Sequence, residues 1–118
     1  MKVQQILSRI YVNEMDQAVV FYEKLLSEKC SMRFQHEKLH LELAQVGTIL
    51  IIAGSDEILQ SFRDTRTVFI VDSIIKFKDF LLMNGATIMK DIKETPTGLN
   101  MIVKHFDGTI AEYVEQRS

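Results

Sequence analysis

Apolar and other residues alternate with period two along Ile6–Val12, which predicts a strand with one face on a core. Ile6, Ser8, Ile10 and Val12 share one face, and Leu7, Arg9 and Tyr11 share the other. Asn13 follows as a candidate N-cap for a helix over residues 14–26. The apolar stripe of that helix consists of Met15, Ala18, Val19, Tyr22, Leu25 and Leu26.

Three strand-like stretches follow this first strand and helix. They are Cys30–Gln35, Leu39–Ala44 and Thr48–Ala53, with turn signals at Gly47 and Gly54. The first half of the chain therefore reads βαβββ.

The second half repeats the same order of elements. Thr65–Val71 matches the opening strand, and Asp72 or Ser73 caps a second helix with Ile74, Phe77, Phe80 and Leu81 on its apolar side. Gly85 stands where a left-handed C-terminal cap is expected. Three strands are then predicted, the last two joined by an Asp107-Gly108 turn: Ala86–Lys90, Leu99–Lys104 and Ile110–Val114.

The pattern predicts an α+β protein made of two βαβββ modules. We expect one domain of 118 residues, with module one at 1–54, a joint at 55–64 that holds a short helix near residues 57–62, and module two at 65–118. The alternative is a ferredoxin-like βαββαβ domain. It needs about six strands and would leave two unexplained.

Composition and charge narrow the classes of partner. The net charge is −2, and Lys and Arg are scattered along the sequence, so it predicts no basic patch that would bind nucleic acid or an anionic membrane. The longest clean apolar run, Ile49–Ala53, is too short to span a bilayer, and the start of the chain lacks the apolar stretch of a secretory signal. A single cysteine, Cys30, fits a reducing compartment, so we expect a cytoplasmic protein.

Two motifs carry a resemblance to a known family. Residues 9–26 combine a strand, the acidic Glu14 and the helical pair Phe21-Tyr22, and residues 105–113 combine an Asp107-Gly108 turn with a final strand that bears Glu112. In this order and spacing the chain resembles the vicinal oxygen chelate superfamily, the glyoxalase, bleomycin-resistance and extradiol-dioxygenase group. His105 and Phe106 depart from the family's Asp-Pro-Asp-Gly turn.

The resemblance implies paired modules whose curved mixed sheets surround a cleft and carry the helices on the outer face, commonly in a homodimer. It also implies four inward side chains that hold a divalent metal. Those positions fall at Leu7, about Ile51, Arg66 and Glu112, and only the glutamate can bind a metal ion. We therefore expect no metal and no cofactor. Arg66 and Glu112 are predicted to pair and to fill the vacated site.

The cleft is expected to be lined by the strand faces that turn away from the helices. The inward list comprises Leu7, Arg9, Tyr11, Arg33, Gln35, His40, Glu42, Ile49, Ile51, Arg66, Val68, Ile70, Asn100, Ile102, Lys104, Ile110, Glu112 and Val114. From it we select as ligand-binding candidates Arg9, Tyr11, His40, Glu42, Arg66, Lys104 and Glu112.

Two functional classes remain open. The first is a protein that binds a small organic molecule in a metal-free cleft. The second is an enzyme. It is either a metal-independent lyase or isomerase of the glyoxalase type, or a metal-dependent one whose ligands lie at other positions than the alignment with the family assigns. Binding is favoured because an enzyme needs a placed acid, base or Lewis acid, and the metal that the resemblance implies has lost its ligands. No catalytic dyad or triad has a recognisable spacing, so no catalytic residue is named.

Overall fold

A computed structural model describes residues Met1–Arg117. The chain separates into two compact units, one built from residues 8–64 and the other from residues 1–7 together with residues from 65 onward. Strand β1 (Val3–Val12) contributes its first half to the second unit and its second half to the first unit.

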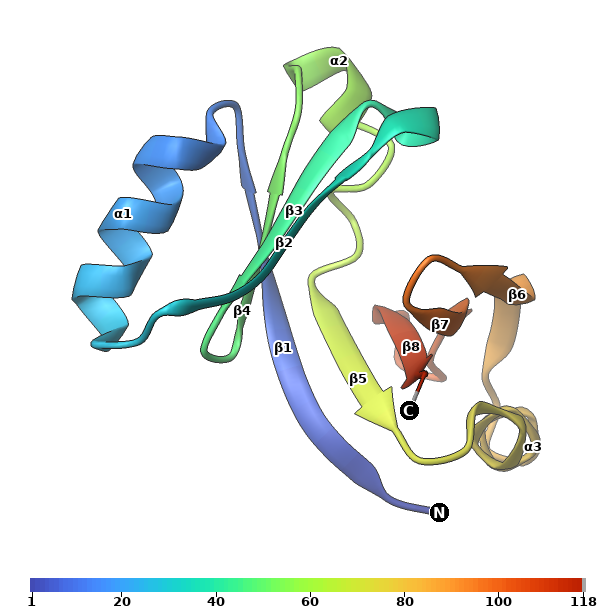
Figure 1. The fold of residues 1–118 in the computed structure, drawn as a ribbon. Coiled ribbons are helices and arrows are strands. Elements are labelled where there is room, and N and C mark those ends of the chain that lie inside the picture. Colours follow the sequence, from blue (N-terminus) through green and yellow to red (C-terminus); the bar gives the residue numbers. More distant parts are fainter. Residues whose placement is uncertain (118) are drawn as a thin grey trace. The chain divides into compact units, whose positions relative to one another are not determined.

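In the unit of residues 8–64, the sheet runs in the order β2-β3-β4-β1. β1 pairs in parallel with β4, and the other two pairings are antiparallel. Figure 1 shows α1 along one face of this sheet. The elements are α1 (Met15–Leu26), β2 (Cys30–His36), the 3₁₀ turn η1 (Glu37–Leu39), β3 (Leu41–Val46), β4 (Ile49–Ala53) and α2 (Asp56–Leu59).

The core of this unit lies between α1 and the sheet. Met15, Ala18 and Val19 of the helix recur at helical spacing and pack on side chains from β3 and β4. The sheet contributes Ala44, Val46, Ile51 and Ala53, all of them buried.

In the other unit, the sheet runs in the order β1-β5-β8-β7-β6, with β5 parallel to β8. Helix α3 covers one face, with Ile74, Phe77 and Leu81 buried. On the sheet side its core contains Val71, Met101, Val103, Ala111 and Tyr113. The elements are β5 (Thr67–Val71), α3 (Ile74–Met83), β6 (Thr87–Thr95), β7 (Gly98–Lys104) and β8 (Ile110–Gln116).

The predicted α+β class and the repeated βαβββ order are confirmed. Eight strands lie within Met1–Arg117, so the six-strand ferredoxin-like alternative is wrong. Ser73 caps α3 and Gly85 has a φ of 82°, as expected.

The predicted cap of α1 is wrong. The Glu14 carboxylate accepts from the Gln17 backbone N–H and caps the helix, whereas Asn13 donates to Gly54 O and Asp56 Oδ1. Met1–Arg117 contains no helix with the length and apolar character needed to cross a membrane.

Candidate functional site

The sheet face opposite α3 holds a polar pair within an apolar surround. Met101, Val103, Ala111 and Tyr113 turn toward the helix, so strand alternation turns Asn100, Ile102, Glu112 and Val114 to the opposite face. The register places Glu112 between Val68 of β5 and Ile102 of β7, and Val114 between Ile70 and Asn100. The prediction that these four side chains face away from the helix is therefore confirmed.

The polar pair consists of Asn100 and Glu112. Asn100 Nδ2 donates a 3.0 Å hydrogen bond to Glu112 Oε2. Asn100 Oδ1 is buried, and within Met1–Arg117 no donor lies within hydrogen-bonding reach of it. Val68 and Ile70, on the neighbouring strand, are 1% and 4% exposed, so the pair sits beside a well-packed apolar wall.

Arg66 and Lys104 do not join this pair. Arg66 precedes β5, is exposed, and forms no ion pair with Glu112 among the described residues, so the predicted Arg66–Glu112 pair is wrong. The reason is a displacement along the strand. Val68, not Arg66, lies in register with Glu112, and two residues of strand span roughly 6.6 Å. Lys104 shares the face but is exposed at its end, opposite Ile110.

On the face opposite α1, Arg9 and Tyr11 lie side by side. Arg9 Nη1 donates to the Tyr11 hydroxyl at 2.9 Å, and that hydroxyl donates to Phe62 O at 2.5 Å. The Arg63 guanidinium lies 5.8 Å from the centre of the Tyr11 ring, a cation–π distance. These contacts attach the segment that follows α2 to strand β1.

Sequence reasoning missed most of the residues that surround Arg9 and Tyr11. Cross-strand pairing forms one row from Arg9 through Leu50 and Gln45 to Met32, and a second from Tyr11 through Ile52 and Leu43 to Phe34. The missed side chains are therefore Met32, Phe34, Leu43, Gln45, Leu50 and Ile52. The cross-strand register, not composition, identifies them.

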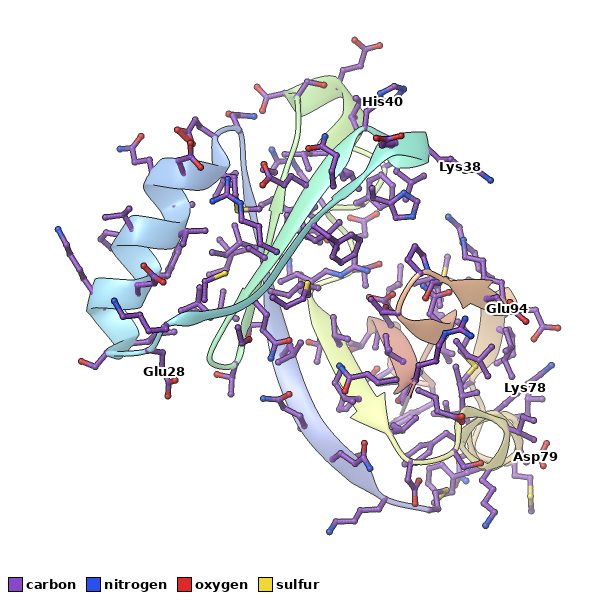
Figure 2. All side chains as sticks on the ribbon, viewed as in Figure 1. Glu28, Lys38, His40, Lys78, Asp79 and Glu94 are labelled. Carbon is purple, nitrogen blue, oxygen red and sulfur yellow. The ribbon has the colours of Figure 1, made fainter. Side chains whose placement is uncertain are left out.

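His40 and Glu42 do not lie on this face, so their predicted inward placement is wrong. Glu42 shares the α1 side of β3 with Ala44, and its carboxylate accepts from Arg33 Nε, while Arg33 Nη2 donates to Asp16 at the start of α1. Figure 2 shows His40 at the end of the β2–β3 hairpin, near Lys38. All four side chains line an open hollow of about 450 Å³.

The causes of these errors differ between the two strands. On β3 both faces carry apolar side chains, Leu41 and Leu43 on one and Ala44 and Val46 on the other, so the pattern does not show which face meets α1. On β2 the cause is a β-bulge. The register shifts between Cys30 and Met32, so Arg33 pairs with Ala44 and turns toward α1. Gln35, opposite Glu42, turns the same way. Ile49 and Ile51, also predicted to face inward, pack in the α1 core.

The positions that carry metal ligands in the resembled superfamily do not fit a divalent ion here. Leu7 is 2% exposed. Ile51 packs in the α1 core, so the β4 side chain on the face opposite α1 is that of Leu50, which pairs with Arg9. Neither leucine can donate an electron pair to a metal. Across residues 1–117, no three His, Cys, Asp or Glu side chains converge so as to hold a metal ion.

Comparisons with known proteins give the following relationships. No protein-family model matches the sequence, and no curated protein does. An uncharacterized protein from Methanosarcina mazei is 48% identical over 99% of this chain and 95% of its own, with a TM-score of 0.88.

Two enzymes share the fold at low identity. Methylmalonyl-CoA epimerase from Mycobacterium tuberculosis has a TM-score of 0.78 at 16% identity, covering 98% of this chain and 90% of its own. The Streptomyces coelicolor epimerase, in complex with 2-nitronate-propionyl-CoA, has a TM-score of 0.77 at 13% identity, covering 99% and 100%. The chain therefore belongs to the same family as the Methanosarcina mazei protein, and it shares its fold with the two epimerases.

Proposed function

We propose that the protein binds a small organic molecule on the sheet face that turns away from α3, without a divalent metal. The observation that carries the proposal is the Asn100–Glu112 pair, held at 3.0 Å among Val68, Ile70, Ile102 and Val114. A few oriented polar groups on an apolar surface are what small-molecule sites usually contain.

The metal-free part of the proposal is supported by the residues at the ligand positions. Leu7, Leu50 and the exposed Arg66 supply no electron pair to a cation, and a single carboxylate from Glu112 does not make a coordination shell. Binding by this protein then depends on hydrogen bonds and apolar contact. Fold neighbours crystallised with CoA derivatives support an organic ligand in general, and acyl-CoA thioesters are accordingly among the probes.

Native mass spectrometry of the purified protein, followed by NMR titration with a panel of acyl-CoA and aromatic compounds, tests this proposal. We expect the mass spectrum to show a bound organic molecule and the NMR resonances of Ile102 and Val114 to change when a compound binds. Ile102→Arg should abolish these changes, whereas Met89→Arg, at a half-exposed position on β6, should not. If no compound perturbs the face around Asn100, binding at this site is rejected.

A second candidate is an isomerase or epimerase that acts on an activated carbon acid. It is favoured by the fold neighbours that are methylmalonyl-CoA epimerases and by Glu112, a carboxylate within an apolar surround that could move a proton. Incubation with methylmalonyl-CoA in deuterated water separates the two functions. Deuterium incorporation that disappears in Glu112→Gln would replace the binding proposal with the enzymatic one.

A further inference from the structure

The orientation of the Asn100 amide is fixed by its partner. An ionised carboxylate accepts hydrogen bonds and cannot donate them, so the group that faces Glu112 Oε2 at 3.0 Å must be the amide nitrogen. The amide oxygen Oδ1 therefore points elsewhere. It is buried, and no described residue donates to it.

A buried acceptor without a donor is uncommon in folded proteins, because its lost hydration is not replaced. From this geometry, and on the basis of the proposed function, we infer that the face opposite α3 selects ligands that present an O–H or N–H hydrogen-bond donor to Asn100 Oδ1. Asn100 is then the residue that determines specificity, and Glu112 is a positioning residue that holds the amide in this orientation.

The surroundings of Asn100 favour ligands that carry a hydrogen-bond donor over ligands that lack one. Val114 is its cross-strand neighbour, and Ile102 follows it on the same face, so a competing ligand without a donor would leave the oxygen unpaired in an apolar setting. Oδ1 itself is buried, so a donor reaches it only when the groups that cover it move. One neutral hydrogen bond corresponds to about a tenfold change in affinity.

Matched pairs of small molecules test this inference directly. The probes are indole with N-methylindole, phenol with anisole, and benzyl alcohol with benzyl methyl ether, titrated into isotopically labelled protein and followed by NMR. The members with a donor are expected to bind about tenfold more tightly than their methylated partners. They should also shift the Asn100 side-chain amide resonance, one of only three asparagine amides in the chain.

Two variants and their controls separate a specific role from a general disturbance. Asn100→Leu removes the acceptor while keeping the size, and the preference within each pair should fall to about one. Glu112→Gln can donate to Asn100 Oδ1 and satisfy it, so the preference should again be lost even though Asn100 is intact. Asn84→Leu and Glu94→Gln, exposed substitutions of the same two kinds, should leave the preference unchanged. Figure 2 shows Glu94 on β6.

The outcomes distinguish the inference from the proposed function on which it rests. Binding of both members of each pair with equal affinity at Ile102 and Val114 would overturn the donor inference and leave the binding function standing. The same holds if the preference survives unchanged in Asn100→Leu with native-like thermal unfolding. If no probe binds to this face, both the donor inference and the proposed binding function are rejected.

Discussion

His105 Nε2 lies 2.7 Å from the hydroxyl of Tyr113, a tyrosine that is only 4% exposed. The Tyr113 ring stacks on Phe69 with 5.0 Å between ring centres and contacts Phe77 of α3. Tyr113 therefore links the β7–β8 turn to the α3 core. Burial raises the pKa of Tyr113 to about 12, because the phenolate would be poorly solvated there.

We expect an alkaline loss of stability that depends on Tyr113. The unfolded tyrosine ionises near pH 10, so between about pH 10 and 12 the unfolded state loses a proton that the folded state keeps. The free energy of unfolding should fall over this window, by on the order of 2 kcal/mol from this group. Chemical denaturation as a function of pH measures it.

The controls are Tyr113→Phe and Tyr22→Phe. Tyr113→Phe should cost about 1 kcal/mol at neutral pH through the lost hydrogen bond, and should flatten the alkaline decline. Tyr22→Phe, on α1, should keep the decline. Identical pH profiles for the native protein and Tyr113→Phe would contradict the assignment.

Gly98 is expected to be far less replaceable than Gly108. Both have a positive φ, 152° and 90°, but a Cβ on Gly98 would lie 2.1 Å from Glu115 O, whereas one on Gly108 would meet nothing within 4 Å. Gly108→Ala should lower the free energy of unfolding by roughly 1 kcal/mol, and Gly98→Ala by roughly 3 kcal/mol or more, because strain and a backbone clash add. Equal losses in urea unfolding would count against this local geometry.

Tyr11→Phe should loosen the segment after α2. The substitution removes the hydroxyl that donates to Phe62 O and accepts from Arg9, at a cost of roughly 1–3 kcal/mol. Hydrogen exchange should accelerate in residues 60–64 more than in β3 or β4. Uniform acceleration, or none, would indicate that Tyr11 does not hold the segment.

The metal-free proposal predicts that dialysed protein retains no stoichiometric zinc, nickel, iron or manganese by elemental analysis. EDTA should leave the midpoint of thermal unfolding unchanged, because no ion contributes to the folded state. One equivalent of a tightly held metal, with a lower midpoint in EDTA, would refute the proposal.

We also expect a two-fold homodimer. Strands β2 and β6 end the strand orders of the two units, and unpaired strand edges favour association. Light scattering at micromolar concentration should give twice the 13.6 kDa mass of the chain. A monomer mass would exclude the dimer at that concentration.

The sequence by itself determined the order of elements and the face of β7 and β8. In β7, Met101 and Val103 make one face wholly apolar, whereas the other face carries Asn100 and Lys104 beside Ile102. The Asp107-Gly108 turn fixes the hairpin that follows. Gly108 has the positive φ that such a turn requires. Local periodicity and turn chemistry were sufficient there, since only one face of each strand can join the α3 core.

Only the tertiary structure decided the faces of β2, β3 and β4. Leu50 and Ile51 are both buried although they point to opposite sides, so an apolar run such as β4 carries no period-two signal. On β3, Leu41 and Leu43 lie on one face and Ala44 and Val46 on the other, so its pattern is equally uninformative. On β2, the bulge between Cys30 and Met32 reverses the facing of Arg33 and Gln35. A one-residue shift inverts every side chain beyond it, and the sequence alone contained no measure of where that shift occurs.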